Sequence, residues 1–535
     1  MRTAYSVETV RAAERELMAR LPAGTLMHRA AAGLAVACAG VLGAGGAGPG
    51  GRGRVSGARV VLLVGSGDNG GDALYAGARL ARRGAGVTAL LLAPDRTHAD
   101  AATALRAAGG RFVDAVDVTV ATSTAGEPGA GGGPGGGPGA AGGGAGSRAV
   151  RGAHPAARAI ARADLVLDGV VGIGGRGGLR PGAQALVAAV VAAGVPVVAV
   201  DLPSGVDADT GEVPGAAVRA TATVTFGTYK PGLLIDPAAE RAGALRLVDI
   251  GLGPWLPPVP DVEALQHADV AAVLPRPAAE SDKYRRGVVG VVAGSARYPG
   301  AAVLAVAGAL RGGAGAVRYV GPAADAVIAR FPEALVSAGP PHRAGRVQAW
   351  VVGPGVGDDA QARQALTDVL ASDVPVLVDA DGLRLLPPDG VRARPAATLL
   401  TPHAGEAAAL LGWSRAEVET RRLAAVRALA ARTGATVLLK GSTTLVAGPD
   451  AEPVRVNPTG TAWLATAGSG DVLSGLTGAL LATGLAARTA ASVGAYLHGL
   501  AARHAASAPG HPGAPVTAFE VAEALGAAWR DVTTA

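Results

Sequence analysis

Cysteine, aromatic residues, lysine and asparagine are all scarce in this chain of 535 residues. A single cysteine, Cys38, excludes an intramolecular disulfide and a cysteine-rich metal cluster. Aromatic residues make up 3% of the chain, and neither dense basic tracts nor finger spacings occur, which argues against nucleic-acid binding despite a net charge of +6. The few lysines and asparagines are Lys230, Lys283, Lys440, Asn69 and Asn457. The rest of the composition is dominated by alanine, glycine, proline and arginine. We therefore expect these few lysines and asparagines to include residues that the chemistry requires.

Hydrophobic residues make up 49% of the chain, which raises the question of a membrane span. The best candidate for a membrane span, residues 183–200, is interrupted by Gln184, Gly194 and Pro196. It is predicted to form a helix, a turn and a buried strand. The N-terminus is charged within its first turns, so no secretory signal is expected. The sequence therefore predicts a cytoplasmic protein that binds neither membranes nor nucleic acid.

Short apolar strands that alternate with helical segments indicate an α/β fold with largely parallel sheets. In the first half, the predicted strands are 59–64, 87–92, 165–167 and 195–200. In the second half, the predicted strands are 288–292, 316–320, 349–352, 374–378, 398–400 and 436–439.

The length of the chain suggests two or three domains. A proline-rich run at 254–260 breaks the strand pattern and marks a boundary. We therefore predict a first domain over residues 1–254, a linker over 255–279 and a second domain over 280–535. A Gly/Pro/Ala tract at 121–147 is predicted to be a flexible insertion in the first domain.

A glycine-rich loop follows the first predicted strand and reads G-S-G-D-N-G-G-D over residues 65–72. A helix is predicted from about Ala73. The spacing fits the G-x-G-x-x-G motif of dinucleotide-binding folds, so an NAD-dependent dehydrogenase is one interpretation. Asp68 and Asp72 argue against it, because carboxylates beside a helix N-terminus repel a pyrophosphate. These acids suit a sugar hydroxyl, a cation or, for Asp72, simple helix capping.

Two further polar segments follow predicted strands. Asp168 precedes a glycine-rich run, and Asp201 opens the sequence D-L-P-S-G. Because ligands of open parallel sheets bind beyond the carboxyl ends of the strands, we expect Asn69, Asp168 and Ser204 to converge. Their amide, carboxylate and hydroxyl oxygens suit a hard cation. Asp201 adds a second carboxylate facing the ligand, although each acid taken singly could be a turn or capping residue.

These motifs together resemble the YjeF N-terminal family, the NAD(P)H-hydrate epimerases, over most of residues 1–254. The resemblance implies a Rossmann-like three-layer fold and interconversion of the R and S hydrates at C6 of the reduced nicotinamide ring. It also implies a potassium ion (K+) on Asn69, Asp168 and Ser204, with Asp201 near the reacting carbon as the general acid or base. Contacts to the hydrate are implied for Asp68, Asn69, Gly70, Gly71, Asp72, Gly172, Ile173, Gly174, Gly175, Arg176, Gly177, Gly178 and Asp201.

Near the C-terminus, a second glycine turn precedes an apolar helix. The sequence N-P-T-G at 457–460 is followed by A-T-A-G-S-G-D at 465–471. Glycines at a helix N-terminus expose N–H donors that can hold a phosphate. Asp471, just inside the helix, is placed to take a proton from a substrate hydroxyl that attacks a terminal phosphoryl group. An ordinary capping aspartate is the alternative.

Other polar segments of the second half also follow predicted strands. Lys440 opens K-G-S-T-T, which suits phosphate or ribose, and His403 lies in T-P-H-A-G-E. Either side chain could instead be a solvated surface residue. Glycine-bearing turns at 353–357 and 294–301 allow a ligand to approach the backbone closely.

These segments resemble the ADP/ATP-dependent NAD(P)H-hydrate dehydratases of the ribokinase-like superfamily, over most of residues 280–535. The resemblance implies a ribokinase-like α/β fold, phosphorylation of the C6 hydroxyl by ADP or ATP with magnesium (Mg2+), and loss of phosphate to restore the dihydronicotinamide. Nucleotide contacts are implied for Lys440, Gly441, Ser442, Thr443, Thr444 and Gly470. Hydrate contacts are implied for Ala301, Gly355, Gly357, His403 and the catalytic Asp471.

The sequence thus predicts a nicotinamide-nucleotide repair enzyme whose first half supplies the epimer that its second half dehydrates. Its partners would be NAD(P)H hydrate and ADP or ATP, and we expect a homo-oligomer. Two alternatives stay open at this point. A small-molecule kinase fused to a Rossmann-type dinucleotide-binding domain leaves Asp68 and Asp72 unexplained. A non-catalytic scaffold leaves Asn69, Asp168 and Asp201 without a purpose.

Overall fold

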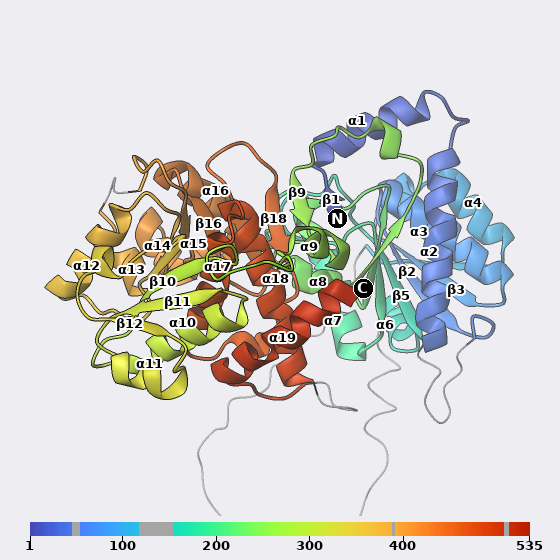
Figure 1. Ribbon diagram of the computed structural model, residues 1–535. Coiled ribbons are helices and arrows are strands. Elements are labelled where there is room, and N and C mark those ends of the chain that lie inside the picture. The colour runs from blue at the N-terminus through green and yellow to red at the C-terminus, as the bar shows by residue number, and fades with distance from the viewer. Residues whose placement is uncertain (45–53, 117–153, 388–390, 508–512, 535) are drawn as a thin grey trace, which may run out of the picture. The chain divides into compact units, whose positions relative to one another are not determined.

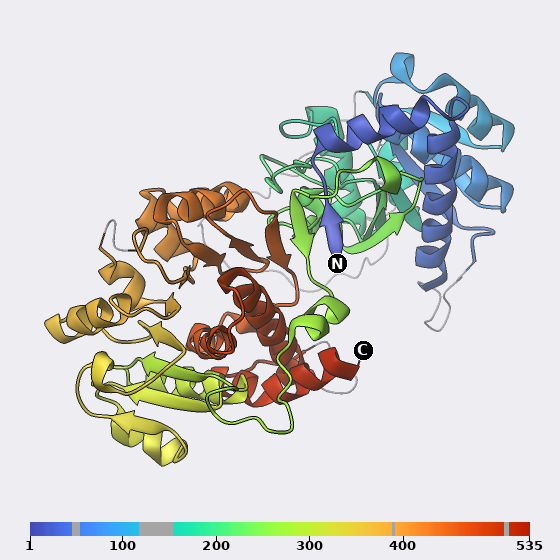
Figure 2. The ribbon, with the colours of Figure 1, turned by 45° about the horizontal axis from the view of Figure 1, so that its top comes forward.

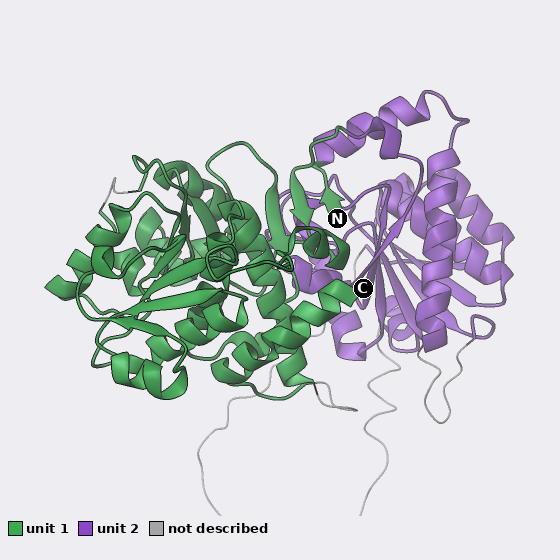
Figure 3. Cartoon of the chain, viewed as in Figure 1, with its two compact units in different colours: residues 1–6, 234–237, 257–535 green, residues 7–233, 238–256 purple. Residues whose placement is uncertain are grey.

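The computed structural model describes residues 1–44, 54–116, 154–387, 391–507 and 513–534 (Figure 1). The predicted insertion at 121–147 lies outside these described residues. Contacts divide the chain into two compact units (Figure 3). Unit 1 comprises Met1–Ser6, Leu234–Pro237 and Pro257–Ala535, and unit 2 comprises Val7–Leu233 and Ala238–Leu256. Residues 255–279, predicted to be a linker, include a strand and a helix of unit 1, β9 (Val262–Ala264) and α9 (His267–Val273).

Unit 2 is built on a seven-stranded sheet in the order β4-β3-β2-β5-β6-β7-β8, and all its strand pairs are parallel. Its strands are β2 (Arg59–Val64), β3 (Gly86–Leu91), β4 (Arg111–Asp114), β5 (Leu165–Gly169), β6 (Val197–Val200), β7 (Ala222–Phe226) and β8 (Ala244–Val248). The four predicted strands of this half are confirmed, with ends that differ by at most two residues. The sequence did not predict β4, β7 or β8.

Helices cover both faces of this sheet. The helices of unit 2 are α1 (Val7–Met18), α2 (Thr25–Ala44), α3 (Asp68–Arg82), α4 (Ala99–Ala107), α6 (Pro155–Ile160), α7 (Pro181–Ala193) and α8 (Ala239–Ala242). On one face, Gly77 of α3 lies so close to Leu62 that a Cβ atom on Gly77 would be 2.6 Å from it. On the other face, α6 and α7 enclose Val61, Leu63 and Val166 in a buried cluster.

Among the described residues, α2 is the one helix long and apolar enough to cross a membrane. It packs against α3 and against β7 and β8, and 39% of its apolar window is buried. The sequence analysis did not select this segment and named residues 183–200 as the best candidate instead. The segment 183–200, examined above as a possible span, lies in α7 and β6 with a left-handed turn at Gly194 (φ 61°). The prediction of a helix, a turn and a buried strand is therefore confirmed.

Unit 1 contains an eleven-stranded sheet in the order β1-β9-β18-β17-β16-β15-β14-β13-β10-β11-β12. The strands not yet introduced are β1 (Arg2–Ala4), β10 (Val288–Val292), β11 (Ala316–Val320), β12 (Leu335–Ser337), β13 (Ala349–Val352), β14 (Val376–Val378), β15 (Thr398–Leu400), β16 (Thr436–Leu439), β17 (Thr444–Ala447) and β18 (Val454–Asn457). All six strands predicted for this half are confirmed, and only β14 differs, by starting two residues later.

The core of unit 1 lies between this sheet and its C-terminal helices, which Figure 2 shows from a second direction. Valines of β10 and β13 pack there against α10, α17, α18 and α19, while α12 and α16 contact β13 and β16. The helices not yet introduced are α10 (Pro299–Arg311), α11 (Ala324–Arg330), α12 (Ala360–Leu370), α13 (Asp381–Leu385), α14 (Ala404–Leu411), α15 (Arg415–Thr420), α16 (Arg422–Thr433), α17 (Ser469–Ala482), α18 (Ala487–Ala506) and α19 (Ala518–Thr534). The expected α/β class is confirmed for both units.

Two candidate active sites

In unit 2, the chain order of the sheet reverses at β2, which pairs with β3 on one side and with β5 on the other. The carboxyl ends of parallel strands form a ligand crevice at such a reversal. The glycine-rich loop leaves β2 there, Asp168 lies near the end of β5, and Asp201 follows β6 directly. The structure therefore brings the three predicted segments to one edge of the sheet.

The loops after β2 and β5 touch each other through their glycines. A Cβ atom added to Gly65 would lie 1.9 Å from the carbonyl oxygen of Val170. One added to Gly172 would lie 2.2 Å from Asn69 Oδ1. Neither position has room for a side chain, so the glycines permit the close approach that seats Asn69 against the second loop.

Helix α3 begins at Asp68, five residues earlier than predicted, and Gly67 is its N-cap residue. The residues from Asp68 to Asp72 therefore lie in the first turns of the helix and not in the preceding loop. The alternative that Asp72 merely caps this helix is wrong.

Asp168, Ser204 and Asn69 form a group of oxygen atoms at this edge. Ser204 donates to Asp168 twice, from its N–H and from its hydroxyl, at 2.7 Å in each case. Burial raises the pKa of the Asp168 carboxyl to about 6, although hydrogen bonds from Ser204 oppose the rise. Asn69 donates its amide N–H to the carbonyl oxygen of Val200. The oxygen atoms of Asp168, Ser204 and Asn69 suit a bound cation. Its positive charge would compensate the negative charge of a carboxylate that burial otherwise destabilises.

Asp201 has a left-handed backbone conformation (φ 66°), which is uncommon outside glycine. Three donors converge on its Oδ1: Lys230 Nζ at 2.5 Å, the Thr225 hydroxyl at 2.9 Å and the Phe226 N–H at 3.1 Å. Asp201 and Lys230 are both almost fully buried. The ion pair holds the carboxylate in one orientation. The sequence analysis named Lys230 only as one of the few lysines and gave it no individual role.

Further carboxyl groups lie near Asp201. Burial, followed by the negative charges of Asp201, Asp68 and Glu14, raises the pKa of Asp72 well above its usual value. Asp72 Oδ1 is buried and has no hydrogen-bond partner among the described residues. Burial also raises the pKa of Glu14 on α1, against the opposing charge of Lys230. Carboxyl groups that retain protons at higher pH than usual suit general acid–base chemistry.

The glycine run from Gly172 to Gly178 lies beside α1. A Cβ atom on Gly174 would be 2.6 Å from the guanidinium group of Arg11, which lies one turn before Glu14. Ile173 packs in a small apolar cluster with Val7, while Arg176 and Gly177 are exposed. The loop and α1 thus lie next to each other near the carboxyl groups of Asp201, Asp72 and Glu14.

In unit 1, the predicted site residues follow neighbouring parallel strands. The turn at 294–301 follows β10, the turn at 353–357 follows β13, His403 follows β15 and Lys440 follows β16. Asp379, which the sequence analysis did not select, follows β14. All these segments therefore meet at one edge of the sheet.

Lys440 forms the centre of this edge. Its Nζ lies 2.7 Å from Asp379 Oδ1 and 3.9 Å from Glu406, and Ser474 of α17 donates to Asp379 Oδ2 at 2.6 Å. Burial acts to lower the pKa of Lys440, but the carboxylates of Asp379 and Glu406 outweigh it and raise the pKa. Because its side chain is only 19% exposed and is ion-paired, the alternative of a solvated surface lysine is wrong.

Asp471 occupies the first turn of α17, two residues after Ser469. Burial and then the charge of Asp379 raise the pKa of Asp471 to about 7, against the opposing effect of Lys440. A Cβ atom on the preceding Gly470 would lie 3.5 Å from Lys440 Nζ, so the helix starts directly beside the lysine. A carboxyl group that titrates near neutral pH at this position has the properties of a general base for phosphoryl transfer.

Arg422 of α16 shapes the predicted nucleotide loop at 440–444. Arg422 is buried and donates to the carbonyl oxygen of Thr443 at 2.8 Å. The hydroxyl of Thr443 accepts a hydrogen bond from the N–H of Asp236 at 3.2 Å, so this side chain is turned into the protein. The neighbouring Gly441 is exposed, so its backbone is accessible to a ligand.

His403 caps α14. Its Nδ1 accepts hydrogen bonds from the N–H groups of Gly405 and Glu406, at 2.9 and 3.1 Å, and Glu406 accepts one from the His403 N–H at 2.8 Å. The side chain of His403 is 59% exposed. The contacts of His403 therefore agree with the alternative of a surface histidine whose hydrogen bonds are made within the protein. Its contact with the hydrate stays a prediction.

The turns that follow β10 and β13 touch each other. A Cβ atom on Gly355 would lie 2.7 Å from the Cβ of Ala301. Gly357 donates its N–H to Asp381 Oδ2 at 3.0 Å. Ala301, Gly355 and Gly357 are thereby held close to an acid whose charge acts on Asp471.

The sequence analysis missed several charged or polar members of the two sites. Asp379 opens D-A-D-G directly after a predicted strand, and that signal is the one that identified Asp168. Glu406 lies inside a motif that was recognised, but only His403 was selected from it. Glu14 and Ser474 carry no comparable signal, because each lies within a helix far along the chain from its partners.

Comparison with known proteins gives two family matches. Residues 23–232 match the YjeF-related protein N-terminus, and residues 289–523 match NAD(P)H-hydrate dehydratase. The chain is 48% identical over 520 residues to the bifunctional NAD(P)H-hydrate repair enzyme Nnr of Mycobacterium leprae, with 97% of each chain covered. It is 48% identical over 494 residues to the enzyme of that name from Mycobacterium tuberculosis, with 92% of each covered.

Among solved structures, the ADP/ATP-dependent NAD(P)H-hydrate dehydratase from Bacillus subtilis, co-crystallized with ATP/Mg2+, is 30% identical to this chain. It covers 50% of this chain and 97% of its own length, with a TM-score of 0.46. On the full-length relatives, the chain belongs to the family of bifunctional NAD(P)H-hydrate repair enzymes.

Proposed function

We propose that this chain repairs hydrated nicotinamide dinucleotides with an epimerase site in unit 2 and an ADP- or ATP-dependent dehydratase site in unit 1. One observation carries the proposal. At the carboxyl edge of each sheet, a buried or largely buried lysine is ion-paired with a carboxylate, and the predicted catalytic aspartate is that carboxylate or lies next to the pair. In unit 2 Lys230 binds Asp201, and in unit 1 Lys440 lies between Asp379 and the start of the helix that carries Asp471.

In unit 2, the R and S hydrates differ in the face of C6 that carries the hydroxyl group. Interconversion requires the bond between C6 and the hydroxyl oxygen to break, with that oxygen leaving as water after it gains a proton, and to re-form on the other face as water adds and loses a proton. Asp201 is the carboxyl group assigned to transfer these protons. The lysine pair and the Thr225 hydroxyl keep Asp201 in position. Asn69, Asp168 and Ser204 would hold a potassium ion, which supplies a fixed positive charge at the crevice. The loops 68–72 and 172–178 would contact the rest of the hydrate.

In unit 1, Asp471 takes the proton of the C6 hydroxyl as its oxygen attacks the terminal phosphoryl group of ADP or ATP. The new phosphate then leaves with the C6 oxygen, C5 loses a proton, and the double bond of the dihydronicotinamide is restored. The loop 440–444 and Gly470 would hold the nucleotide, and Ala301, Gly355, Gly357 and His403 the hydrate. Lys440 lies where it can neutralise the phosphates.

Magnesium would enter with the nucleotide phosphates, which supply most of its ligands in such enzymes. We further propose that the chain acts in the cytoplasm as a homo-oligomer, where reduced nicotinamide dinucleotides and ADP or ATP are available.

The test is to incubate a mixture of R and S hydrates with ADP or ATP and to follow the near-ultraviolet absorbance of the reduced nicotinamide. Wild type should consume both epimers. Asp471→Asn should abolish recovery, whereas Asp201→Asn should slow only the R portion, down to its spontaneous conversion. Recovery by Asp471→Asn at the wild-type rate, or equal recovery of R and S by Asp201→Asn, would contradict the assignments.

A further inference from the structure

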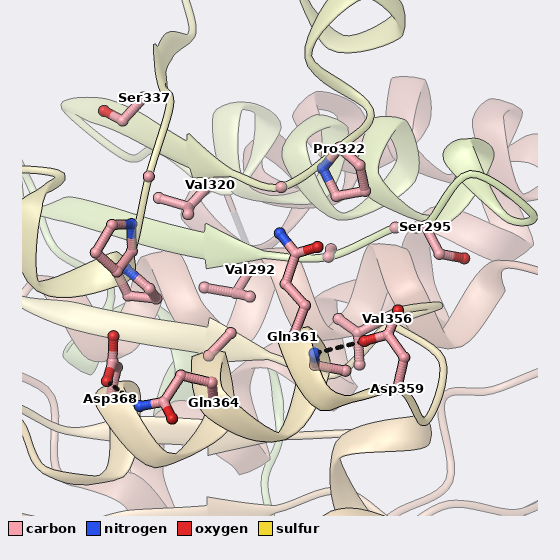
Figure 4. Close-up of a pocket in the computed structure, with 18 of the residues that line it drawn as sticks. Val292, Ser295, Val320, Pro322, Ser337, Val356, Asp359, Gln361, Gln364 and Asp368 are labelled. Carbon is pink, nitrogen blue, oxygen red and sulfur yellow. Dashed lines mark hydrogen bonds between the residues drawn. The ribbon is translucent and has the colours of Figure 1, made fainter.

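A cavity of about 510 Å³ opens in unit 1 where β10, β11 and β12 end (Figure 4). Its size falls within the range of roughly 300–1,000 Å³ that is usual for small-molecule sites. Val292, Val320 and Ser337 lie on its strand side, and α12 forms the opposite wall. Ligands of open α/β sheets bind at these carboxyl ends, yet neither the nucleotide loop nor Asp471 lines this cavity.

The lining of the cavity is mostly apolar, with polar groups supplied from α12. In Figure 4, Gln361 points across the cavity, while Gln364 and Asp368 lie at its far end. Asp368 is already engaged, since it accepts from Gln364 at 3.0 Å and lies 3.0 Å from His342 Nδ1. Asp359 caps α12 by accepting from the N–H of Ala362 at 2.8 Å. Among the described residues, the lining contains no lysine or arginine.

This lining suits a flat, uncharged ring and not a phosphate group. Two carboxylates in a lining that contains no lysine or arginine disfavour a phosphate. Valine side chains and the rings of Pro322 and Pro341 offer apolar surface for the faces of an aromatic ring. A glutamine amide both donates and accepts, and this is the pairing that glutamine makes with the edge of adenine in nucleic-acid recognition. Gln361 is placed to make such a pair.

The cavity adjoins the dehydratase site through the turn after β13. Val356 lines the cavity, and its neighbours Gly355 and Gly357 are candidate hydrate contacts. In the sheet, β10, β11 and β12 lie two, three and four strands away from β14, which is followed by Asp379. At about 4.8 Å per strand, this separation is roughly 10–19 Å. A dinucleotide spans such a distance, whereas a single nucleotide bound at Asp471 does not fill it.

We propose that this cavity holds the adenine ring of the hydrate itself, the half of the dinucleotide that is remote from the reacting ring. The inference rests on the proposed function, which puts the nicotinamide ring at Asp471. The adenine of ADP or ATP is not the occupant, because the loop at 440–444 follows β16, on the opposite side of β14. The two adenines therefore approach the reacting group from opposite ends of the sheet.

The experiment compares the hydrate of NADH with the hydrate of reduced nicotinamide mononucleotide, using the full chain and saturating ADP. Wild type should show a higher kcat/KM for the dinucleotide. Gln361→Leu should reduce this advantage roughly three- to tenfold through KM, as expected for one lost hydrogen bond. Ala365→Phe, which fills the cavity, should reduce it at least as much. Arg363→Leu is the matched control, because Arg363 lies on α12 but does not line the cavity.

Free adenosine gives an independent measurement. It should compete with the dinucleotide hydrate but not with the mononucleotide hydrate, which leaves the cavity empty. Inhibition of both hydrates alike would place adenosine in the ADP site and overturn the proposal. So would an unchanged dinucleotide advantage in Gln361→Leu and Ala365→Phe. If wild type recovers reduced nicotinamide from neither hydrate, the proposed function itself fails, and this outcome is distinct from the others.

Discussion

Asp471 offers the most direct chemical test at the scale of single residues. Burial and the charge of Asp379 raise the pKa of its carboxyl to about 7, while Lys440 opposes the rise. Only the ionised form can accept the proton of the C6 hydroxyl, so kcat for dehydration should rise with pH through about 7 and then level off. A pH profile of kcat at saturating ADP, from about pH 5.5 to about pH 8.5, measures this. A flat profile would remove Asp471 from the role of general base.

Asp381 supplies the control for that profile. Its charge also raises the pKa of Asp471, and asparagine at this position keeps an oxygen to accept from Gly357. Asp381→Asn should therefore move the inflection of kcat to lower pH. Asp325→Asn removes an exposed charge on α11 and should leave the inflection where it is.

Asp72 is expected to lower the stability of unit 2 at neutral pH. Burial, followed by Asp201, Asp68 and Glu14, raises its folded-state pKa well above the unfolded value. Whatever this group contributes to stability is therefore present below the unfolded pKa and is lost as pH rises through the folded pKa. Asp72→Asn removes the titration. Its advantage over wild type should grow between about pH 4 and about pH 8 and reach roughly 2–4 °C in Tm.

Calorimetric Tm values across this pH range measure the difference, with epimerase activity followed in parallel. The activity of Asp72→Asn should fall, since a stabilising change at a strained site commonly costs function. Asp100→Asn, an exposed acid on α4, is the matched control and should show no such growth with pH. A constant Tm difference between Asp72→Asn and wild type would show that Asp72 does not titrate as expected.

Several of the site residues that the sequence predicted follow a predicted strand, although Asp379, which also follows one, was missed. Asp168, Asp201 and Lys440 were found because apolar runs locate strand ends, and strand ends locate ligands in parallel sheets. Partners brought in by tertiary contact were not found. Ser474 reaches Asp379 from 95 residues away and lies in an apolar helix, where a serine gives no signal of its own.

At the scale of elements, the predicted strands matched the structure to within two residues, but other strands and one helix start were missed. The missed strands are the edge strands β1, β4, β8 and β12 and the interior strands β7, β9, β17 and β18. Strands β1 and β9 have three residues each, and β1 is defined by its pairing with β9 across the length of the first domain. The start of α3 was placed too late because its first turn contains Gly70 and Gly71, which are poor helix formers. Gly70 is required there, since a Cβ atom would lie 2.4 Å from the carbonyl oxygen of Gly65.

The position of Asp471 depends on how closely α17 packs against α10. A Cβ atom on Gly475 would lie 1.9 Å from the carbonyl oxygen of Ala305, and one on Gly308 would lie 2.2 Å from that of Val472. Gly475→Val should force the two helices apart and cost about 1–3 kcal/mol of stability. Dehydratase kcat should fall more than about tenfold, because small displacements of a catalytic group are costly. Thermal unfolding and the absorbance assay measure the two effects.

Gly526→Ala in α19 is the control for this change. The nearest group to its new Cβ atom is the flexible side chain of Arg530, at 3.6 Å. The variant should be neutral or slightly more stable, by about 0.5–1 kcal/mol, because alanine is the better helix former. The epimerase activity of unit 2 should survive both substitutions. Wild-type dehydratase kcat in Gly475→Val would show that the α10 contact does not position Asp471.

For the whole molecule, composition located the main division of the chain but not the segments that cross it. The run at 254–260 lies at the boundary, yet Met1–Ser6 and Leu234–Pro237 belong to unit 1. Neither segment has a composition that sets it apart from its neighbours. Their membership comes from β1 pairing with β9 and from the N–H of Asp236 donating to Thr443. These contacts join residues that are far apart in the sequence, so local sequence patterns cannot predict them.

These crossing segments predict that a fragment of residues 257–535 is an impaired dehydratase. The fragment loses the β1 pairing and the hydrogen bond from the Ser6 N–H to Asp261, so its Tm should be lower than that of unit 1 in the full chain. It also loses the support of Thr443 by Asp236, so KM for ADP should rise roughly three- to tenfold, as for one lost hydrogen bond. Turnover at saturating ADP should change little, because Asp471, Lys440 and Asp379 all remain.

Two variants of the full chain separate these effects. Deletion of residues 1–6 should reproduce the loss of Tm but not the change in KM, since the strand in this segment pairs with β9 and not with a strand that precedes the nucleotide loop. Thr443→Val should reproduce the rise in KM for ADP with a smaller loss of Tm, because it removes one acceptor and leaves β1 in place. A fragment that matches the full chain in both Tm and KM would show that unit 1 is complete without the crossing segments. The prediction requires Tm to fall in the deletion of residues 1–6 and KM for ADP to rise in Thr443→Val.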